Sequence, residues 1–375
     1  MAERIRTVSR RPASLGSVPP GAISLAMGEP DADTPALVVD AAIGALRAGR
    51  TRYEPLTGSP PLREAIARRL SEESGASVTA DRVVLTHGAT AGLAAAIIAI
   101  VGPGDTVVLP EPTYSLYADH VAMAGGQVVW VPTCADGRLR LDLIEQAAPG
   151  AALIVLCNPG NPTGQVVPTE DVSALVDIAA RHGAYLLSDE AYADIVFDGV
   201  EVASIVRYPG APEIAICCRT FSKSYAMTGW RLGYVAAPEE IASRINLIHR
   251  TLNGALATFV QDAGVAALAL SDEHVTRLRH VLQERRDLVV DAMKDVPFID
   301  LATPRGAFYA FPRVDRAAPS QELAEVLASR GGVLVRAGSE YGPSGEGHLR
   351  LSFATGEQAL RTGIERFLLT LEGLT

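Results

Sequence analysis

The chain has 375 residues, enough for two domains or for one large domain with an added lobe. Hydrophobic residues make up 48% of it and the net charge is −10, so it suits a packed globular core and lacks the excess of Lys and Arg with which sequence-independent nucleic-acid-binding proteins displace counterions. Its four cysteines have no Cys-x-x-Cys spacing and no histidine-rich neighbourhood, which argues against a metal centre.

The chain begins with a polar and basic segment, MAERIRTVSRRPASLGS, which lacks the apolar stretch of a secretory signal. The longest apolar stretch, residues 91–102, is shorter than the ~20 residues that cross a bilayer and is typical of a buried helix. We therefore expect a cytoplasmic protein that binds neither membranes nor nucleic acid.

From about residue 50 to residue 240, short runs of β-branched residues alternate with helical patterns. The runs are nearly continuous in apolar residues, as in strands that helices cover on both faces. This alternation predicts an α/β fold with a doubly wound, mostly parallel sheet. The predicted strands are 82–88, 105–112, 127–132, 151–159, 184–190, 213–221 and 232–238, and helices are predicted at 90–101 and 173–183.

The C-terminal part has a different pattern. One long helical segment, roughly 255 to 295, precedes short strands in GAFYAFPRV, VLVRAG and HLRLSFA, with helices near 320–330 and at the end of the chain. This order predicts a smaller α+β lobe, on which the N-terminal 40 residues are expected to pack because they have too little core of their own. We predict a large domain at 45–270 and a small domain formed by 1–44 and 271–375.

In open parallel sheets, ligands bind beyond the carboxyl ends of the strands. The polar residues there include a single carboxylate and no Ser–His–Asp order, so the set lacks hydrolase machinery. It has the parts to hold a flat, anionic cofactor that carries an aldehyde. The residues at the strand ends are Gly88, Ala89, Thr90, Tyr114, Asn158, Asn161, Asp189, Tyr192, Thr220 and Lys223.

Two turns in this set have both a structural and a functional interpretation. Residues 88–90 stand where a strand turns into a helix, so their N–H groups could bind a phosphate, although such a glycine turn also simply permits tight packing. The NPGNPTG run at 158–164 could be only a chain of turns. Because two Asn-Pro pairs follow a buried strand so closely, we favour a functional site.

Two charged residues, Asp189 and Lys223, likewise have both a structural and a functional interpretation. Asp189 ends an otherwise apolar strand, where it is either a helix N-cap or the counter-ion of a protonated pyridine nitrogen. Lys223 in TFSKSYAMTGWRLGY is either an incidental loop lysine or a nucleophile that forms a Schiff base. In the functional interpretation, Arg231 holds the cofactor phosphate from the far side of the loop.

The sequence resembles the fold-type I, pyridoxal-phosphate-dependent aminotransferases of the class I/II family, in their prokaryotic aspartate-aminotransferase-like branch. The joint order and spacing of the motifs, which span nearly the whole chain, make this resemblance specific. The motifs are SLAMGEPDADTP, RYEPLTGSPPLREAIA, THGATAGL, PEPTYSLY, CNPGNPTG, SDEAYADI, TFSKSYAMTGWRLGY and HLRLSFA.

The resemblance implies a role for each matching residue. Lys223 would bind pyridoxal 5′-phosphate covalently and move the substrate proton, with Asp189 on the pyridine nitrogen. The other implied cofactor contacts are Tyr192 and Asn161 to the phenolic oxygen, Tyr114 on the ring, Gly88, Ala89, Thr90, Thr220, Ser222 and Arg231 to the phosphate, and Tyr53 to the phosphate of the other subunit of a homodimer. Arg350 would bind the substrate α-carboxylate in a bidentate pair, with Asn161 and Gly28 on the substrate side.

The implied reaction moves an amino group between an L-amino acid and a 2-oxo acid by a ping-pong mechanism. A β-lyase, a racemase, or a cyclising or replacement enzyme of a biosynthetic pathway could carry the same motifs, and AMTGWRLGY favours transamination. An effector-binding module of a transcription regulator would have a DNA-binding domain before the cofactor domain, whereas only about 20 residues precede SLAMGEP. No residue matches the second arginine of dicarboxylate-specific members, and Arg350 could instead be an edge-strand arginine.

Overall fold

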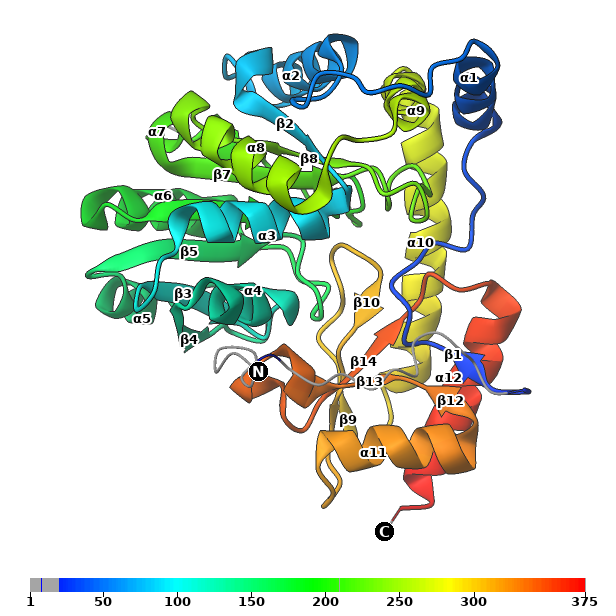
Figure 1. The fold of residues 1–375 in the computed structure, drawn as a ribbon. Coiled ribbons are helices and arrows are strands. Elements are labelled where there is room, and N and C mark those ends of the chain that lie inside the picture. The colour runs from blue at the N-terminus through cyan, green and yellow to red at the C-terminus, as the bar shows by residue number, and fades with distance from the viewer. Residues whose placement is uncertain (1–7, 9–19, 209, 375) are drawn as a thin grey trace.

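The computed structural model describes residues 8, 20–208 and 210–374 of the chain. They form a large sheet covered by helices and a smaller region of short strands and helices, and α10 (Asp272–Met293) runs along both (Figure 1). The predicted α/β class, with a large, mostly parallel sheet and a smaller α+β part, is confirmed. Residues 1–7 and 9–19 of the predicted small domain lie outside the described residues.

Within the part of the chain that the structure describes, the large sheet has seven strands in the order β2-β8-β7-β6-β5-β3-β4. Strand β8 runs antiparallel to both its neighbours, and the other paired strands are parallel. Every predicted strand of this sheet is confirmed. The strands are β2 (Val83–Thr86), β3 (Thr106–Glu111), β4 (Gln127–Pro132), β5 (Ala151–Cys157), β6 (Tyr185–Asp189), β7 (Ala215–Thr220) and β8 (Gly233–Ala236).

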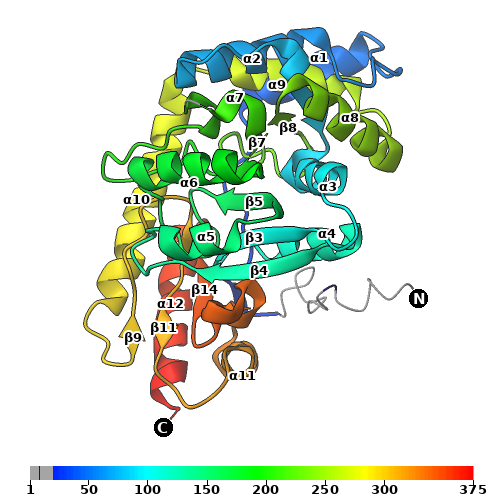
Figure 2. The same ribbon diagram turned by 90° about the vertical axis from the view of Figure 1, so that its left-hand side faces the viewer.

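Helices cover both faces of this sheet, which explains why its strands are apolar on both sides (Figure 2). Neighbouring residues of β3 illustrate the arrangement, because Val107 and Val108 are both buried but belong to different hydrophobic clusters. One face packs against α3 (Gly88–Ile100), α4 (Leu116–Ala124) and α8 (Glu239–Asn253). The other packs against α2 (Pro60–Ser74), α5 (Leu141–Ala147), α6 (Thr169–His182), α7 (Ala211–Ile214) and α9 (Thr258–Leu268).

The smaller region is built around a third hydrophobic cluster. Its central element in the described chain is an antiparallel sheet in the order β10-β14-β13, formed by β10 (Tyr309–Ala310), β14 (Leu349–Ser352) and β13 (Arg336–Ala337). Two strand pairs flank it, β1 (Ile23–Ser24) with β12 (Val333–Leu334) and β9 (Ile299–Asp300) with β11 (Arg313–Val314). Helices α11 (Ser320–Val326) and α12 (Glu357–Glu372) complete the region.

Two segments near the predicted domain boundary, residues 255–295 and residues 23–47, do not each belong to a single structural unit. The prediction of one helical segment over 255–295 is wrong, because α9 ends at Leu268 and α10 begins at Asp272 after the extended residue Ser271. Helix α1 (Ala36–Arg47) packs on α9 through the large-sheet cluster, whereas β1 pairs with β12 of the smaller region. The division at residues 45 and 271 stays a prediction.

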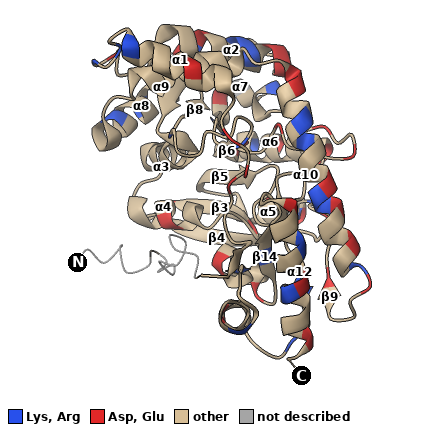
Figure 3. Ribbon diagram, turned by 90° about the vertical axis from the view of Figure 1, so that its right-hand side faces the viewer, with Lys and Arg blue, Asp and Glu red and all other residues tan. Residues whose placement is uncertain are grey.

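Charged residues of both signs follow one another along α10 (Figure 3), where Glu273 and Arg277 form an ion pair. Among the described helices, none combines the length and the apolar composition needed to cross a membrane. The cytoplasmic location inferred from the sequence stays a prediction.

Candidate active site

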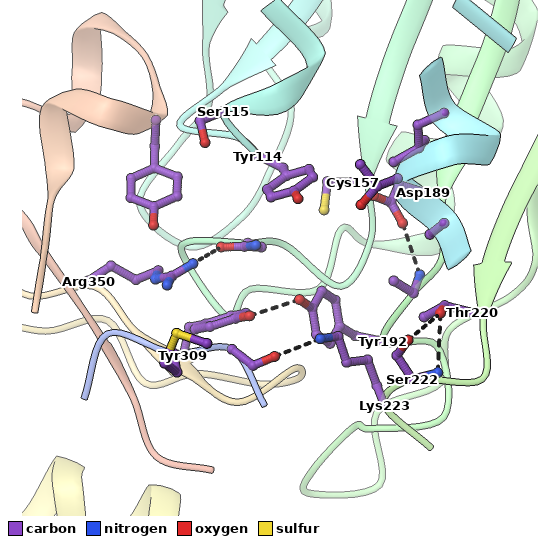
Figure 4. Close-up of a pocket in the computed structure, with 18 of the residues that line it drawn as sticks. Tyr114, Ser115, Cys157, Asp189, Tyr192, Thr220, Ser222, Lys223, Tyr309 and Arg350 are labelled. Carbon is purple, nitrogen blue, oxygen red and sulfur yellow. Dashed lines mark hydrogen bonds between the residues drawn. The ribbon is translucent and has the colours of Figure 1, made fainter. Parts of the chain in front are cut away.

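A cavity of about 280 Å³ opens where the strands of the large sheet end, facing the smaller region (Figure 4). The last residues of β5, β6 and β7 (Cys157, Asp189 and Thr220) all line it, because the carboxyl ends of parallel strands meet at one edge of a sheet. The predicted site residues on its wall are Gly28, Ala89, Thr90, Tyr114, Asn161, Asp189, Tyr192, Thr220, Ser222, Lys223, Arg231 and Arg350.

Lys223 follows β7, and its side chain reaches into the cavity instead of the solvent (Figure 4). Its Nζ donates a hydrogen bond of 2.6 Å to the carbonyl oxygen of Gly28 and lies 6.0 Å from the centre of the Tyr192 ring. Burial lowers the pKa of the Lys223 amine to about 8. A fraction of this amine is therefore unprotonated near neutral pH, and that form can act as a nucleophile or a general base.

Asp189 ends β6 as a buried carboxylate with two neutral hydrogen-bond donors. The Tyr117 hydroxyl donates to its Oδ2 at 2.7 Å, and the Ala191 backbone N–H donates to its Oδ1 at 3.1 Å. The second bond caps the turn at residues 191–194, and the interpretation of Asp189 as a helix N-cap is wrong, because no helix begins there in the described chain. Burial nevertheless raises the pKa of this carboxyl to about 6, so an ionised Asp189 would be stabilised by a cation brought in by a ligand.

Arg350 is buried at the opposite end of the cavity, on β14. Its Nη1 donates to Asn161 Oδ1 at 3.0 Å, its Nη2 donates to the Ala26 carbonyl at 2.6 Å, and its Nε has no partner. The interpretation of Arg350 as an edge-strand residue is wrong, since β14 lies between β10 and β13. A buried guanidinium with neutral partners and a free donor is suited to a carboxylate ligand.

Aromatic side chains form the wall between these two ends. The hydroxyl groups of Tyr192 and Tyr309 are 2.9 Å apart, and the guanidinium of Arg350 lies 4.4 Å from the centre of the Tyr309 ring. Gly28 packs against this wall without a side chain, because a Cβ there would collide with the Tyr309 hydroxyl. Tyr114 lines the cavity beside Tyr117 at a ring-centre distance of 5.5 Å.

The turn into α3 and the loop after β7 gather hydrogen-bond donors at the cavity. Gly88 opens α3 with φ 76°, and a Cβ at this position would lie 2.6 Å from Arg231 Nη2. Arg231 itself has φ 57°, a conformation that non-glycine residues adopt only when their surroundings hold them. The Thr220 hydroxyl donates to Ser222 Oγ at 2.9 Å. Exposed N–H groups at a helix N-terminus together with a guanidinium suit a phosphate.

Three residues of the predicted set do not line the cavity, among them Asn158, whose Oδ1 accepts a hydrogen bond from the Val167 backbone N–H at 3.0 Å. Gly88 stands directly before the lining residues Ala89 and Thr90, whereas Tyr53 is 93% exposed and lies outside the cavity. No group of His, Cys, Asp or Glu side chains in the described residues could hold a metal ion.

The sequence interpretation missed several residues of the cavity wall. It also missed Tyr117, which does not line the cavity itself but lies on a helix and donates a hydrogen bond to Asp189, although it stands three residues after Tyr114 in a motif already noted. Arg336 lines the cavity directly opposite Arg350 in the β13–β14 pair and forms an ion pair with Glu340. The position of this arginine at the end of the apolar run VLVR was a sequence signal that could have indicated a site residue. The other missed lining residues are Ala26, Met27, Leu93, Ser115, Cys157, Ala191, Tyr309 and Tyr341.

Comparisons with known proteins cover nearly the whole chain. Residues 20–367 match the family described as aminotransferase class I and II. The chain is 34% identical to an aspartate aminotransferase of Pyrococcus horikoshii over 99% of this chain and 95% of that protein. It is 36% identical to aromatic-amino-acid aminotransferase 2 of Thermococcus litoralis over 92% of this chain and 90% of that protein. The solved aspartate aminotransferase of Rhizobium meliloti superimposes with a TM-score of 0.92 at 30% identity, covering 100% of this chain and 99% of the other.

Proposed function

Because the chain belongs to the class I and II family of aminotransferases, we propose that the cavity between Asp189 and Arg350 binds pyridoxal 5′-phosphate and is the active site. The family assignment makes the chain a pyridoxal-phosphate-dependent aminotransferase of fold type I. One observation carries the placement of the site. A partly buried lysine amine and a buried carboxylate without a cationic hydrogen-bond partner line the same cavity.

The residues of the cavity fit this cofactor group by group. Asp189 would hold the protonated pyridine nitrogen, whose charge offsets the cost of burying the carboxylate. Tyr192 and Asn161 would donate to the phenolic oxygen, and Tyr114 would cover the ring. The phosphate would lie against Gly88, Ala89, Thr90, Thr220, Ser222 and Arg231, and Lys223 Nζ would hold the cofactor covalently.

The bound cofactor supplies an aldehyde and an electron-withdrawing ring, which make the substrate Cα–H acidic. The protein supplies the base. Lys223 Nζ, with its lowered pKa, accepts the proton from Cα and returns it when the amino group moves. The carbonyl of Gly28 accepts a hydrogen bond from Nζ and so holds the amine on the substrate side of the cavity.

Arg350 binds the α-carboxylate that amino acids and 2-oxo acids share. Its forked donors match a carboxylate, and Asn161 fixes one of them. Since both substrates use this one arginine, they occupy the site in turn, which is the physical basis of a ping-pong mechanism. Arg336 is already neutralised by Glu340, so Arg350 is the arginine we assign to the α-carboxylate.

Transamination is distinguished from the alternatives by its need for a second substrate. We expect cofactor-loaded protein mixed with one L-amino acid to lose its visible absorption band and to release one 2-oxo acid per site, then to stop. Addition of a second 2-oxo acid should restore the band. A β-lyase or a racemase would continue to turn over with the amino acid alone, and that outcome would overturn transamination.

A homodimer with shared active sites is the second part of the proposal. It is supported by Tyr53, which is 93% exposed, and by exposed apolar side chains in the same N-terminal segment, Leu37 (68%), Leu46 (45%) and Leu56 (46%). In such a dimer Tyr53 would reach the cofactor phosphate of the other subunit.

This proposal predicts complementation. Lys223→Ala and Tyr53→Ala proteins, each impaired alone, should regain activity when mixed under conditions of subunit exchange, because one site of each hybrid dimer then carries neither change. Up to half of the hybrid sites recover. The matched control mixes Lys223→Ala with Asp189→Asn, whose defects stay with their own cavities, so no recovery is expected. Activity no higher than the average of the parents in the first mixture would rule the shared site out.

A further inference from the structure

Two histidines stack behind the turn that opens α3. His87 joins β2 to α3, and His249 lies on α8. Their ring centres are 5.2 Å apart with an interplanar angle of 28°. His249 Nε2 lies 3.2 Å from the His87 backbone nitrogen and 3.2 Å from His87 Nδ1. Neither ring lines the cavity, so this pair contributes nothing to the chemistry described above.

His249 accepts the backbone hydrogen bond as a neutral ring. It is 1% exposed, and an Nε2 that accepts the His87 N–H carries no proton, so the ring proton is on Nδ1. Nδ1 has no hydrogen-bond partner in the structure. Burial and the neighbouring His87 lower the pKa of His249 to about 4, which keeps the ring an acceptor at neutral pH.

The contact fixes the peptide unit from which α3 starts. The first N–H groups of a helix have no partner within the helix, and His249 binds the one on His87, directly before the helix begins. On the other side of the same residue, Arg231 Nη2 donates to the His87 carbonyl at 3.4 Å. Gly233 closes the turn from behind, since a Cβ there would lie 2.9 Å from the nitrogen of Ala89.

We propose that His249 is a positioning residue for the cofactor phosphate, because its neutral imidazole holds the His87 N–H and so orients the free N–H groups of Ala89 and Thr90 toward the cavity. The inference rests on the proposed phosphate site. It gives His249 a function although the residue contacts neither cofactor nor substrate. If His249 only filled the core between α3 and α8, replacing it would not weaken the binding of the phosphate more than the binding of the rest of the cofactor.

The test compares two ligands that differ only in the phosphate. Cofactor-free protein is titrated with pyridoxal 5′-phosphate and with pyridoxal, and both dissociation constants are measured from absorbance. His249→Phe keeps a ring of similar size and removes the acceptor. We expect it to bind pyridoxal 5′-phosphate about 10-fold more weakly, the effect of leaving one N–H unpaired, and to bind pyridoxal as the unmodified protein does.

Two further variants separate positioning from folding. His249→Gln places an amide oxygen near the position of Nε2 and should stay within about 3-fold of the unmodified protein for both ligands. Ile245→Val removes a methylene from a fully buried residue of the same helix and should leave the ratio of the two dissociation constants unchanged. If His249→Phe does not fold, His249→Asn replaces it, because the shorter amide cannot reach the His87 N–H.

The outcomes distinguish the inference from the proposed function. Equal weakening of both ligands in His249→Phe, or no change in either, would overturn the role of His249. An unmodified protein that binds pyridoxal as tightly as its phosphate would instead overturn the phosphate site itself.

Discussion

At the cofactor end of the cavity, the polar groups follow directly after strands of the large sheet, whereas at the substrate end they come from short strands of the smaller region and from the segment 26–28. Asp189 and Thr220 are the last residues of β6 and β7. Arg350 and Arg336 lie opposite each other in β14 and β13. The segment 26–28 connects the two ends of the cavity. The Ala26 carbonyl accepts a hydrogen bond from Arg350 at the substrate end, and the Gly28 carbonyl accepts one from Lys223 at the cofactor end.

Each end also holds one buried ionisable group whose hydrogen-bond partners are all neutral, and the two groups have opposite charges. Asp189 is a buried carboxyl whose hydrogen-bond donors are neutral, and Arg350 is a buried guanidinium whose acceptors are neutral. Each would gain its counter-charge from a ligand, the first from the cofactor ring and the second from the substrate. The comparison teaches that cofactor binding and substrate binding should respond to separate substitutions, which the following predictions test.

The largest effect is expected from Lys223→Ala, which removes the only base at the reacting carbon in the proposed mechanism. Turnover should fall to the background rate, while the variant still folds and binds the cofactor reversibly. Borohydride should fix the cofactor to the unmodified chain and not to the variant. The sequence contains a second lysine, Lys294, which is exposed and directly follows α10, so Lys294→Ala is the matched control and should label normally. Covalent labelling of Lys223→Ala would contradict the assignment.

Asp189→Asn should be the next most damaging change, because the variant keeps the shape and loses the charge that holds the pyridine nitrogen protonated. We expect proton abstraction in a single turnover to slow by roughly 10³-fold or more, with a smaller loss in cofactor affinity. Tyr117→Phe is the control at the same end, since it removes one hydrogen bond from Asp189 and leaves the charge. Near-normal single-turnover rates in Asp189→Asn would mean that the residue only caps its turn.

Arg350→Lys should break the substrate end alone. The charge remains, but the fork that matches a carboxylate is lost, so kcat/KM should fall by roughly 10² to 10³-fold through a raised KM. Cofactor affinity should not change. Arg336→Lys is the matched control, because Glu340 already neutralises Arg336 and the substitution should cost less than about 10-fold. An equal loss in both variants would show that the two arginines share the substrate.

The smallest predicted effect is on the stability of the cofactor-free protein. The pKa of Asp189 is about 6 in the folded chain and 3.8 as its ordinary value, so between these pH values the folded state holds more protons than the unfolded state. Its stability relative to Asp189→Asn should therefore fall as pH rises from about 4 to about 6, by about 3 kcal/mol in total, and then stay level.

Urea unfolding of both proteins between pH 4 and pH 8 measures this difference. With bound cofactor this pH dependence should change sign, because the pyridine cation then favours the ionised carboxylate of Asp189. A stability difference that does not change with pH would show that burial of Asp189 imposes no charge penalty.

Much of the cofactor end was predictable from the sequence. Lys223, Asp189 and Asn161 each stand just after an apolar run, and parallel strands bring such positions to one edge regardless of how the helices pack. The same reasoning did not bring Tyr309 or Arg336 to the site, because their short strands belong to the smaller region and no local pattern specifies how that region packs against the large sheet. It also missed the break between α9 and α10, since the apolar spacing continues across residues 269–271.

By itself, therefore, the sequence determined the α/β class, the order of the strands along the chain and which side chains reach the edge of the large sheet, because these depend on local pattern and on the geometry of parallel strands. Only the tertiary structure decided the partners of those side chains. Arg350 and the Ala26 carbonyl are 324 residues apart, and His249 reaches His87 across 162 residues. Such contacts depend on how α8 and the three-stranded sheet pack against the rest of the chain, and no local pattern specifies that packing.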